Sequence, residues 1–341
     1  MRVILSSSLT QKKEMIKPMA KLAIVGARNA IISHLLEFLH LRGVKKDDIT
    51  LLKAAGGNDE LSFGDDTLRY ANVAQADWDS FASVVFVADE VLAKDYIPQA
   101  LKGKARVINA TEAADFAFAP LVVSGAEVLK SAPLINYPHP LAAAALRALN
   151  VLKKYRIKTI RLSAYIGADM AGEEGMNELY NHTRRILMND VPQDKRIFPK
   201  TLAFNVIPQA GSFIGEETEF EWMLNSQIKR GLGSEIKVHA NCAIVPVFIG
   251  AGMFINAELD ADADIDAAMG EFANARGIRL NDQQKDGGYA TLTDAQGETD
   301  IFISRVRSDT TVDNGLGFWV SGDINLNAAA DIAAILKSWK V

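Results

Sequence analysis

The sequence is poor in three things: cysteine, net positive charge and long apolar runs. One cysteine, Cys242, among 341 residues excludes the internal disulfide framework that small secreted domains use. Lys and Arg number 37 against 42 Asp and Glu, so the net charge is -5 and no basic surplus is available to bind nucleic-acid phosphates. The longest apolar run, 243–255, is shorter than the roughly 18 residues that a membrane span needs. We therefore expect a cytoplasmic protein that contacts neither nucleic acid nor membrane.

The remaining composition is that of a folded globular protein. Apolar residues make up 49% of the chain and charged residues 23%, both close to ordinary usage. A chain of 341 residues exceeds what one hydrophobic core usually supports, which predicts two domains. Residues 1–20 hold only a short apolar stretch, too brief for a signal peptide, and we expect them to form a flexible lead-in.

The first part of the chain alternates apolar strands with helical patterns. An apolar strand at 22–25 ends in Gly26, and helix-spaced apolar residues follow from Asn29. Such alternation predicts an α/β fold with a Rossmann-like, doubly wound parallel sheet, because each strand is buried on both faces. The further strands are expected at 49–52, 84–87, 106–108 and 121–123, with a helix at 92–101.

After a helix at 139–155 the pattern changes to longer strands without a helix after each one. This change predicts an α+β domain with a mostly antiparallel sheet, covered on one face by helices. We expect the first domain at 21–137 plus 322–341 and the second at 138–321. The expected strands are 158–166, 237–243, 245–255, 300–306 and 316–320, and the expected helices are 173–188, 216–231, 265–275 and a last one at 327–339, which we expect to return to the first domain.

The junction at 134–144 is the most informative segment, because an apolar strand passes through two prolines into an alanine-rich helix. A strand end that leads into a helix N-terminus is where an acyl-transferring dehydrogenase would hold its nucleophile. The helix dipole lowers the pKa of a cysteine there, and free backbone N–H groups bind an oxyanion. Here the helix opens on Pro140, which has neither a nucleophilic side chain nor a backbone N–H.

From about Lys21 to the C-terminus, the order of these elements resembles the aspartate-semialdehyde dehydrogenase family. The resemblance includes the stretches 203–209 (AFNVIPQ), 245–247 (VPV), 305–309 (RVRSD) and 319–320 (WV). It implies dimers that use NADP, a cysteine nucleophile and a histidine base to interconvert an acyl phosphate and an aldehyde, in a role related to amino-acid biosynthesis.

By this resemblance, the family's reactive positions are occupied by other residues in this chain. The nucleophile position is Pro140, the glutamine position is Ile166 and the base position is Ala251. The positions of two arginines and a lysine that bind the substrate's anionic groups hold Asp115, Ile244 and Met223. The chain therefore resembles the family's non-catalytic, Usg-like branch, and we expect no catalytic residue among these positions.

The expected cofactor loop also departs from the family, whose first strand leads into a GATGAVG-like loop. Only Gly26 remains of its glycines, in the sequence Gly26-Ala27-Arg28-Asn29, although bare glycines are what allow a backbone to approach a pyrophosphate. Gly26, Ala27 and Arg28 are the candidates for binding NADP or NAD. The alternative is that Arg28 is simply an exposed loop residue, and we expect no cofactor.

Three other groups have simpler explanations than a reactive site. Cys242 and His239 lie three residues apart on a predicted strand, which sends them to opposite faces, so we expect a buried, inert thiol. His139 is either a replacement base or a helix cap. The acidic run at 260–266 has calcium-loop spacing, but Ile265 stands where that loop requires glycine, so we predict no metal site. We expect this run to cap a helix through Asp264 instead. We expect the acidic cluster at 216–221 to cap a helix and face water.

Two functions follow from these observations. The first is a homodimeric, non-catalytic protein with a binding or regulatory role, of which a heteromeric complex with another protein subunit is one form. The alternative is a diverged NAD(P)-dependent oxidoreductase of the same family that acts on an unphosphorylated substrate.

Overall fold

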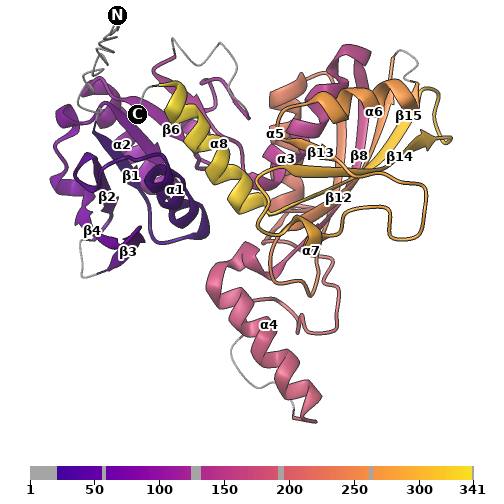
Figure 1. The fold of residues 1–341 in the computed structure, drawn as a ribbon, viewed down its shortest axis with the longest axis horizontal. Coiled ribbons are helices and arrows are strands. Elements are labelled where there is room, and N and C mark those ends of the chain that lie inside the picture. The colour runs from indigo at the N-terminus through magenta and orange to yellow at the C-terminus, as the bar shows by residue number, and fades with distance from the viewer. Residues whose placement is uncertain (1–20, 56–58, 124–131, 191–195, 261–263, 340–341) are drawn as a thin grey trace, which may run out of the picture.

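The computed structural model describes residues 21–55, 59–123, 132–190, 196–260 and 264–339. The expected lead-in at 1–20 lies outside the described residues. The chain forms a seven-stranded sheet and a six-stranded sheet, each with its own helices, and Figure 1 shows the two side by side.

The seven-stranded sheet has the order β3-β4-β2-β1-β5-β6-β7 and is parallel except where β3 meets β4. Alternate residues of β1 explain the double winding. Leu22 and Ile24 pack in the core that contains α1, whereas Ala23 and Val25 pack in the core that contains α2. The predicted parallel, doubly wound sheet is therefore confirmed. Its elements are β1 (Leu22–Val25), α1 (Ala30–Leu41), β2 (Ile49–Lys53), β3 (Glu60–Phe63), β4 (Asp66–Asn72), β5 (Ser83–Phe86), α2 (Glu90–Lys102), β6 (Arg106–Asn109) and β7 (Leu134–Asn136).

Two details of this sheet differ from the prediction. The run 121–123 is not a strand, because it makes only an isolated parallel bridge between Leu121 and Asn136. The hairpin of β3 and β4 was not predicted from the sequence, and it extends the sheet beyond β2.

The six-stranded sheet has the order β11-β8-β12-β15-β14-β13. The pairings β8–β12, β12–β15 and β14–β15 are antiparallel, and those of β11 with β8 and of β13 with β14 are parallel, so the predicted mostly antiparallel sheet is confirmed. Helices α3, α5 and α6 pack on one face. The elements are α3 (Pro140–Leu152), β8 (Ile157–Ile166), α5 (Glu219–Leu232), β11 (Lys237–Ile244), β12 (Ala251–Leu259), α6 (Ile265–Asn274), β13 (Ile278–Leu280), α7 (Leu292–Ala295), β14 (Ile301–Asp309) and β15 (Gly315–Gly322), with a short hairpin of β9 (Phe213–Ile214) and β10 (Glu217–Thr218).

The predicted strand at 245–255 begins only at Ala251. Pro246 has no N–H to give to a sheet, and the N–H of Val247 bonds to the carbonyl of Val245 at 2.8 Å, which turns the chain. The helix predicted from 216 begins at Glu219, because Thr218 is its N-cap and shares a capping box with Glu221.

Two helices connect these layers to the rest of the molecule. The C-terminal helix α8 (Ile324–Ser338) follows β15 but packs against α1, and the Arg42 guanidinium donates a hydrogen bond to the carbonyl of Ala333. In Figure 1, α8 lies between the two sheets. Helix α4 (Gly172–Leu187) follows β8 and projects below the second sheet as an arm. The domain bounds given above stay a prediction.

Candidate functional site

The strand-to-helix junction after β7 is held by a buried amide. Asn136 is 4% exposed, and its Oδ1 accepts a hydrogen bond from Asn109 Nδ2 at 2.7 Å. Its own Nδ2 donates to the carbonyls of Phe116 at 2.7 Å and Ala119 at 3.0 Å. Every polar atom of this side chain therefore has a partner, and the strand end is fixed against the loop at 116–119.

The N-terminus of α3 has little left to offer a ligand. Pro140 is the first helical residue, and the N-cap His139 accepts the N–H of Leu141 on Nδ1 at 3.2 Å. The N–H of His139 itself donates to Gln227 Oε1 at 2.8 Å. The donors that would form an oxyanion hole at this junction are thus missing at Pro140 and already bonded at its two neighbours.

His139 is a helix cap and not a replacement base, which agrees with the simpler of the two interpretations of the sequence. Burial lowers the pKa of His139 to about 4, so the ring is neutral at neutral pH. Because Nδ1 accepts the Leu141 N–H, we assign the ring proton to Nε2. A ring in this state has no free acceptor nitrogen and cannot remove a proton from a substrate.

Four of the other positions that the resemblance assigns to chemistry hold buried hydrocarbon. Ile166 and Ala251 are partners in the register of β8 and β12, and each is 1% exposed. Ile244 and Met223 are buried as well, and Asp115 forms a surface ion pair with Lys94 at 3.4 Å. The structure brings the first two together, at one end of the second sheet, and neither of these side chains can carry a proton or bind an anion.

The space beside this junction is small. A cavity of about 110 Å³ lies between the loop after β6, the end of β7 and α5, and Tyr137, Pro138, Met223, Gln227 and Arg230 are among its lining residues. Known ligand pockets usually measure about 300–1,000 Å³. Arg230, the cation in this lining, donates to the carbonyl of Ala119 at 2.7 Å.

Close packing against the backbone at Val87 explains why the loop after β1 has a glycine at position 26. Gly26 has φ of +152°, and a Cβ there would come within 2.0 Å of the carbonyl oxygen of Val87. Asn29 is the N-cap of α1, with Oδ1 accepting the N–H of Ile32 at 2.9 Å and Nδ2 donating to the carbonyl of Ala27 at 3.1 Å. The amide of Asn29 therefore occupies the first turn of α1, where dinucleotide-binding folds place a pyrophosphate. The residues present do not fit that cofactor.

Arg28 is exposed and lines a separate cavity of about 500 Å³ between α1 and the β3–β4 hairpin, together with His40 and the carboxylates Glu37 and Glu60. Gly26, Ala27 and Arg28 thus lie in sequence at the end of β1, and of the three Arg28 lines this cavity. Lys53, at the end of β2, forms an ion pair with Asp59.

The single thiol is buried, as predicted. Cys242 is 4% exposed on β11, and burial, with Glu221 nearby, raises its pKa to about 12. His239 is exposed on the opposite face of the strand. Glu221 was expected to face water in an acidic cluster, but its Oε1 accepts the N–H of Cys242 at 2.9 Å and its Oε2 that of Thr218 at 2.8 Å, so it joins α5 to β11.

Sequence reasoning missed Asp169, which lies three residues after the end of β8. Its Oδ1 accepts the N–H of Gly250 at 3.2 Å and its Oδ2 accepts Asn325 Nδ2 at 3.1 Å. Desolvation, with a smaller contribution from Asp323, raises the pKa of Asp169 to about 6. No motif around Asp169 signals this, because its partners come from two distant segments.

Within the described ranges, no group of three or more His, Cys, Asp or Glu side chains is placed to hold a metal ion. Residues 261–263 of the acidic run lie outside the described residues, and Asp264 is the N-cap of α6 by position but makes no capping hydrogen bond with its side chain. No helix in the part of the chain that the structure describes is long and apolar enough to cross a membrane.

Comparison with known proteins adds to this geometry. A family model described as semialdehyde dehydrogenase, dimerisation domain, matches residues 149–326. Aspartate-semialdehyde dehydrogenase of Bacillus subtilis is 28% identical over 326 residues, which cover 90% of this chain and 93% of that protein. A USG-1 protein homolog of Pseudomonas aeruginosa is 26% identical over 324 residues, which cover 92% of this chain and 95% of that protein. The crystal structure of aspartate semialdehyde dehydrogenase II from Vibrio cholerae superposes with a TM-score of 0.85 at 27% identity, over 94% of this chain and 98% of that one.

Proposed function

The chain belongs to the semialdehyde dehydrogenase family, and we propose that it is a homodimeric, non-catalytic member with a binding or regulatory role. The observation that carries the proposal is the closed N-terminus of α3. Covalent catalysis on an acyl group needs a nucleophile and donors for the oxyanion that its attack creates. Pro140 supplies neither, and the neighbouring N–H groups are bonded to His139 and Gln227.

Neither the single thiol nor the residue at the base position substitutes for these groups. Cys242 is buried on β11 with a pKa of about 12, so it holds almost no thiolate at neutral pH. Ala251, at the base position, has no titratable atom. The loss of several groups that act as a unit supports loss of the reaction rather than a change of substrate.

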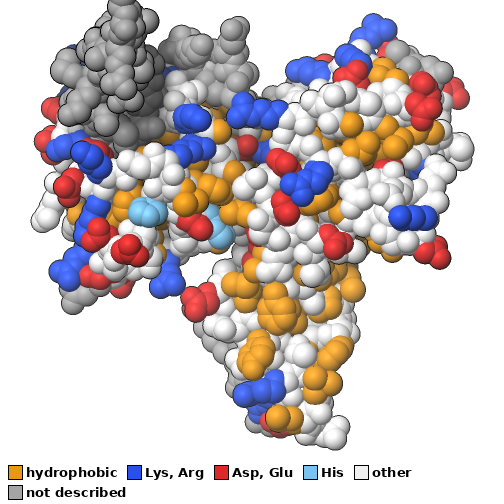
Figure 2. Space-filling model, in the orientation of Figure 1, with side chains coloured by type: hydrophobic (Ala, Val, Ile, Leu, Met, Phe, Trp, Pro, Cys, Tyr) orange, Lys and Arg blue, Asp and Glu red, His pale blue; other side chains and the backbone are white. Residues whose placement is uncertain are grey.

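Two apolar surfaces support the homodimer. The face of the second sheet opposite α3, α5 and α6 carries an aromatic cluster of Tyr165, Phe254 and Trp319, with the last two ring centroids 4.7 Å apart. Figure 2 shows hydrophobic side chains gathered along the arm that contains α4, where Tyr180 and Leu187 are exposed. Exposed apolar patches of this kind mark contacts between subunits, and both lie in the region that the family model describes as a dimerisation domain.

The same surfaces would accept the corresponding face of a related dehydrogenase subunit, which is the heteromeric form of this proposal. A location in the cytoplasm agrees with one buried, unpaired thiol.

Thermal unfolding of the purified protein with saturating NADP and then NAD tests the proposal, together with an assay of NADP reduction with aspartate semialdehyde and phosphate. We expect no shift and no turnover. A ligand at about 100 times its Kd would add roughly 2.7 kcal/mol to the stability, a shift of several degrees. A shift with either cofactor, accompanied by turnover that an Ala251→Trp variant abolishes, would contradict the proposal.

One observation favours the alternative, an NAD(P)-dependent oxidoreductase acting on an unphosphorylated substrate. Asp169 has a pKa of about 6 and is hydrogen-bonded to Gly250, the residue before Ala251. A carboxyl group with such a pKa suits proton transfer near neutral pH. Under this alternative, the cofactor shifts the unfolding temperature, and turnover with an aldehyde is lost in an Asp169→Asn variant.

A further inference from the structure

A turn in the chain that returns from the α4 arm to the second sheet holds an aromatic residue in a conformation that favours glycine. Phe204 has φ of +58°, and its side chain is 64% exposed. The N–H of Asn205 donates to the carbonyl of Leu202 at 2.9 Å, which makes Phe204 the third residue of a hydrogen-bonded turn. Glycine or asparagine is usual at a turn position with positive φ, and a bulky aromatic residue is an outlier there.

Contacts on both sides of the turn maintain this conformation. Asn205 Nδ2 donates to the carbonyl of Thr201 at 3.0 Å, and Leu202 is buried in the core. Ile207 and Ile244, the last residue of β11, exchange backbone hydrogen bonds of 3.0 and 2.8 Å. Strain that the surrounding structure maintains gathers at functional positions. Because the strained residue carries an exposed hydrocarbon ring, its use is a contact with another surface rather than a reaction.

The face of the second sheet opposite α3, α5 and α6, called the outer face below, has an apolar hollow of about 300 Å³. Phe254 of β12, Trp319 of β15 and Arg305 of β14 are among its lining residues. The Trp319 indole is held in place, because Nε1 donates to the carbonyl of Ala290 at 2.9 Å. The ring also lies close against Gly252, where a Cβ would come within 2.2 Å of it. The hollow is therefore preformed and has a fixed aromatic wall.

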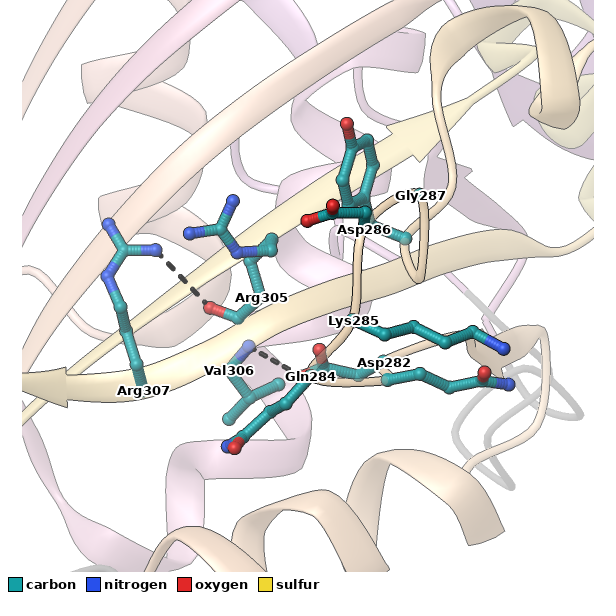
Figure 3. A pocket seen from close by; sticks show the side chains of 10 residues that line it. Asp282, Gln284, Lys285, Asp286, Gly287, Arg305, Val306 and Arg307 are labelled. Carbon is teal, nitrogen blue, oxygen red and sulfur yellow. Dashed lines mark hydrogen bonds between the residues drawn. The ribbon is translucent and has the colours of Figure 1, made fainter.

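A bulge in β14 adds guanidinium groups to the rim of this hollow. The register between β14 and β15 shifts between Ser304 and Arg307, and Arg305 has φ of +57°. Figure 3 shows the Arg305 and Arg307 side chains rising from β14 toward the same side. The Arg307 guanidinium is 5.9 Å from the ring centre of Phe254. Guanidinium groups stack on aromatic rings, so a hollow with this lining suits an aromatic side chain better than an aliphatic one.

We propose that the Phe204 ring of each subunit of the homodimer inserts into the outer-face hollow of the other subunit. This inference rests on the homodimer proposed above and names the contact that fixes its geometry. Both features lie in the region 149–326 that matches the dimerisation domain. A rigid aromatic side chain in a preformed pocket is the arrangement that carries most of the binding energy in many protein interfaces.

The order of the strands explains why the ring fills the hollow of a second copy and not its own. The turn is joined to the edge strand β11, whereas the hollow lies over β12, β15 and β14, beyond β8. At 64% exposure, the Phe204 ring is not inserted in its own chain. In a two-fold dimer each contact occurs twice, and an axis between the packed faces exchanges the two sides of the sheet. Each ring then lies over the hollow of the other subunit.

Removing the ring tests the contact. Phe204→Gly suits the left-handed backbone, so the fold is retained and only the ring is lost. We expect the dissociation constant of the dimer, measured by sedimentation velocity over a range of concentrations, to rise about tenfold or more while the circular dichroism stays unchanged. The matched control is Phe118→Ala, at an aromatic position that is 80% exposed on the loop after β6, and its dimer should be as tight as that of the wild type.

A mixing experiment tests whether the ring and the hollow lie on different subunits. Leu292 lines the hollow, and Leu292→Trp fills the hollow from its own side, so this variant should also dimerise about tenfold or more weakly. A heterodimer of the two variants keeps one Phe204 ring and, on the other subunit, one open hollow. We therefore expect native mass spectrometry of an equimolar mixture to show the heterodimer well above its statistical share of the dimers.

The outcomes separate this contact from the homodimer itself. A wild type that sediments as a monomer at micromolar concentration contradicts the homodimer, and this contact with it. If the wild type is dimeric but Phe204→Gly dimerises as tightly, or if the heterodimer forms only in its statistical share, the homodimer stands and the contact is wrong. A loss of folding in Leu292→Trp would be visible in its circular dichroism, and the Phe204→Gly result then decides alone.

Discussion

At the scale of single residues, the surroundings decide the chemistry. The chain has a thiol at Cys242 and an imidazole at His139, the two kinds of group that the resemblance implies for the family's reaction. Burial keeps the first protonated, and a capping hydrogen bond occupies the acceptor nitrogen of the second. Residue types alone therefore do not make a reactive site.

The buried thiol should resist modification until the protein unfolds. Because the pKa of Cys242 is about 12 and the side chain is 4% exposed, we expect its reaction with 5,5′-dithiobis(2-nitrobenzoate) at pH 8 to be at least a hundredfold slower in the native protein than in urea. The absorbance of the released thiolate measures both rates. A native rate close to the unfolded one would show that β11 is accessible and that the thiol is available for chemistry.

Asp169 should make the protein less stable as the pH rises from about 4 to about 6. Its folded pKa is about 6 against an ordinary 3.8, so between these values the folded state binds the proton more tightly than the unfolded state does. Stability from this group is complete below pH 4 and is lost as the pH passes 6. Asp169→Asn removes the titration, and the unfolding temperature of the variant relative to the wild type should increase across this interval.

Other carboxylates titrate in the same range, but they are common to both proteins and cancel in the comparison. Asp309→Asn is the control of opposite sign, because the hydrogen bond from Thr311 lowers the pKa of Asp309. Its stability relative to the wild type should fall with rising pH. A flat difference for Asp169→Asn would show that this carboxyl titrates as in water.

At the scale of elements, a buried ion pair joins α3 to α8. Arg147, 7% exposed, pairs with Asp331, which also accepts the hydroxyl of Tyr137 at 2.8 Å. Removing one charge leaves the other buried, so Asp331→Leu should cost about 3–5 kcal/mol, whereas Arg147→Met with Asp331→Leu should recover much of that loss. Urea unfolding measures both.

An exposed ion pair beside the second sheet is the control for this experiment. Glu298→Gln removes the partner of Arg279 and should cost at most about 1 kcal/mol. If the single and double variants at Arg147 and Asp331 were equally unstable, the loss would come from packing volume rather than from the unpaired charge.

The sequence predicted the elements well where a local signal was present. The β1 strand and its closing glycine were placed from an apolar run, α1 was placed from the helix-spaced residues that follow from Asn29, and Pro140 was placed at a helix start. The run 121–123 has strand composition, but it meets only the last residue of β7, so no ladder can form. The bulge at Arg305 and the partners of Asp169 arise from pairing between distant segments, which spacing along the chain does not encode.

At the scale of the whole molecule, the apolar face of the second sheet and the α4 arm decide whether the protein is a monomer or a homodimer. We expect the wild type to sediment at twice the 37.1 kDa of one chain. Phe254→Lys places a charge in the aromatic cluster of that face, and burying an unpaired ammonium against a second copy costs several kcal/mol. The variant should therefore dissociate at micromolar concentration while its circular dichroism stays unchanged.

Leu41→Lys, an exposed apolar position on α1 of the other sheet, is the matched control and should remain dimeric. If Phe254→Lys stays dimeric and a charge on the arm, Leu187→Lys, dissociates the protein, the arm rather than the sheet holds the subunits together. If neither variant dissociates, both surfaces are free in the homodimer, and their apolar side chains are then available to a different partner.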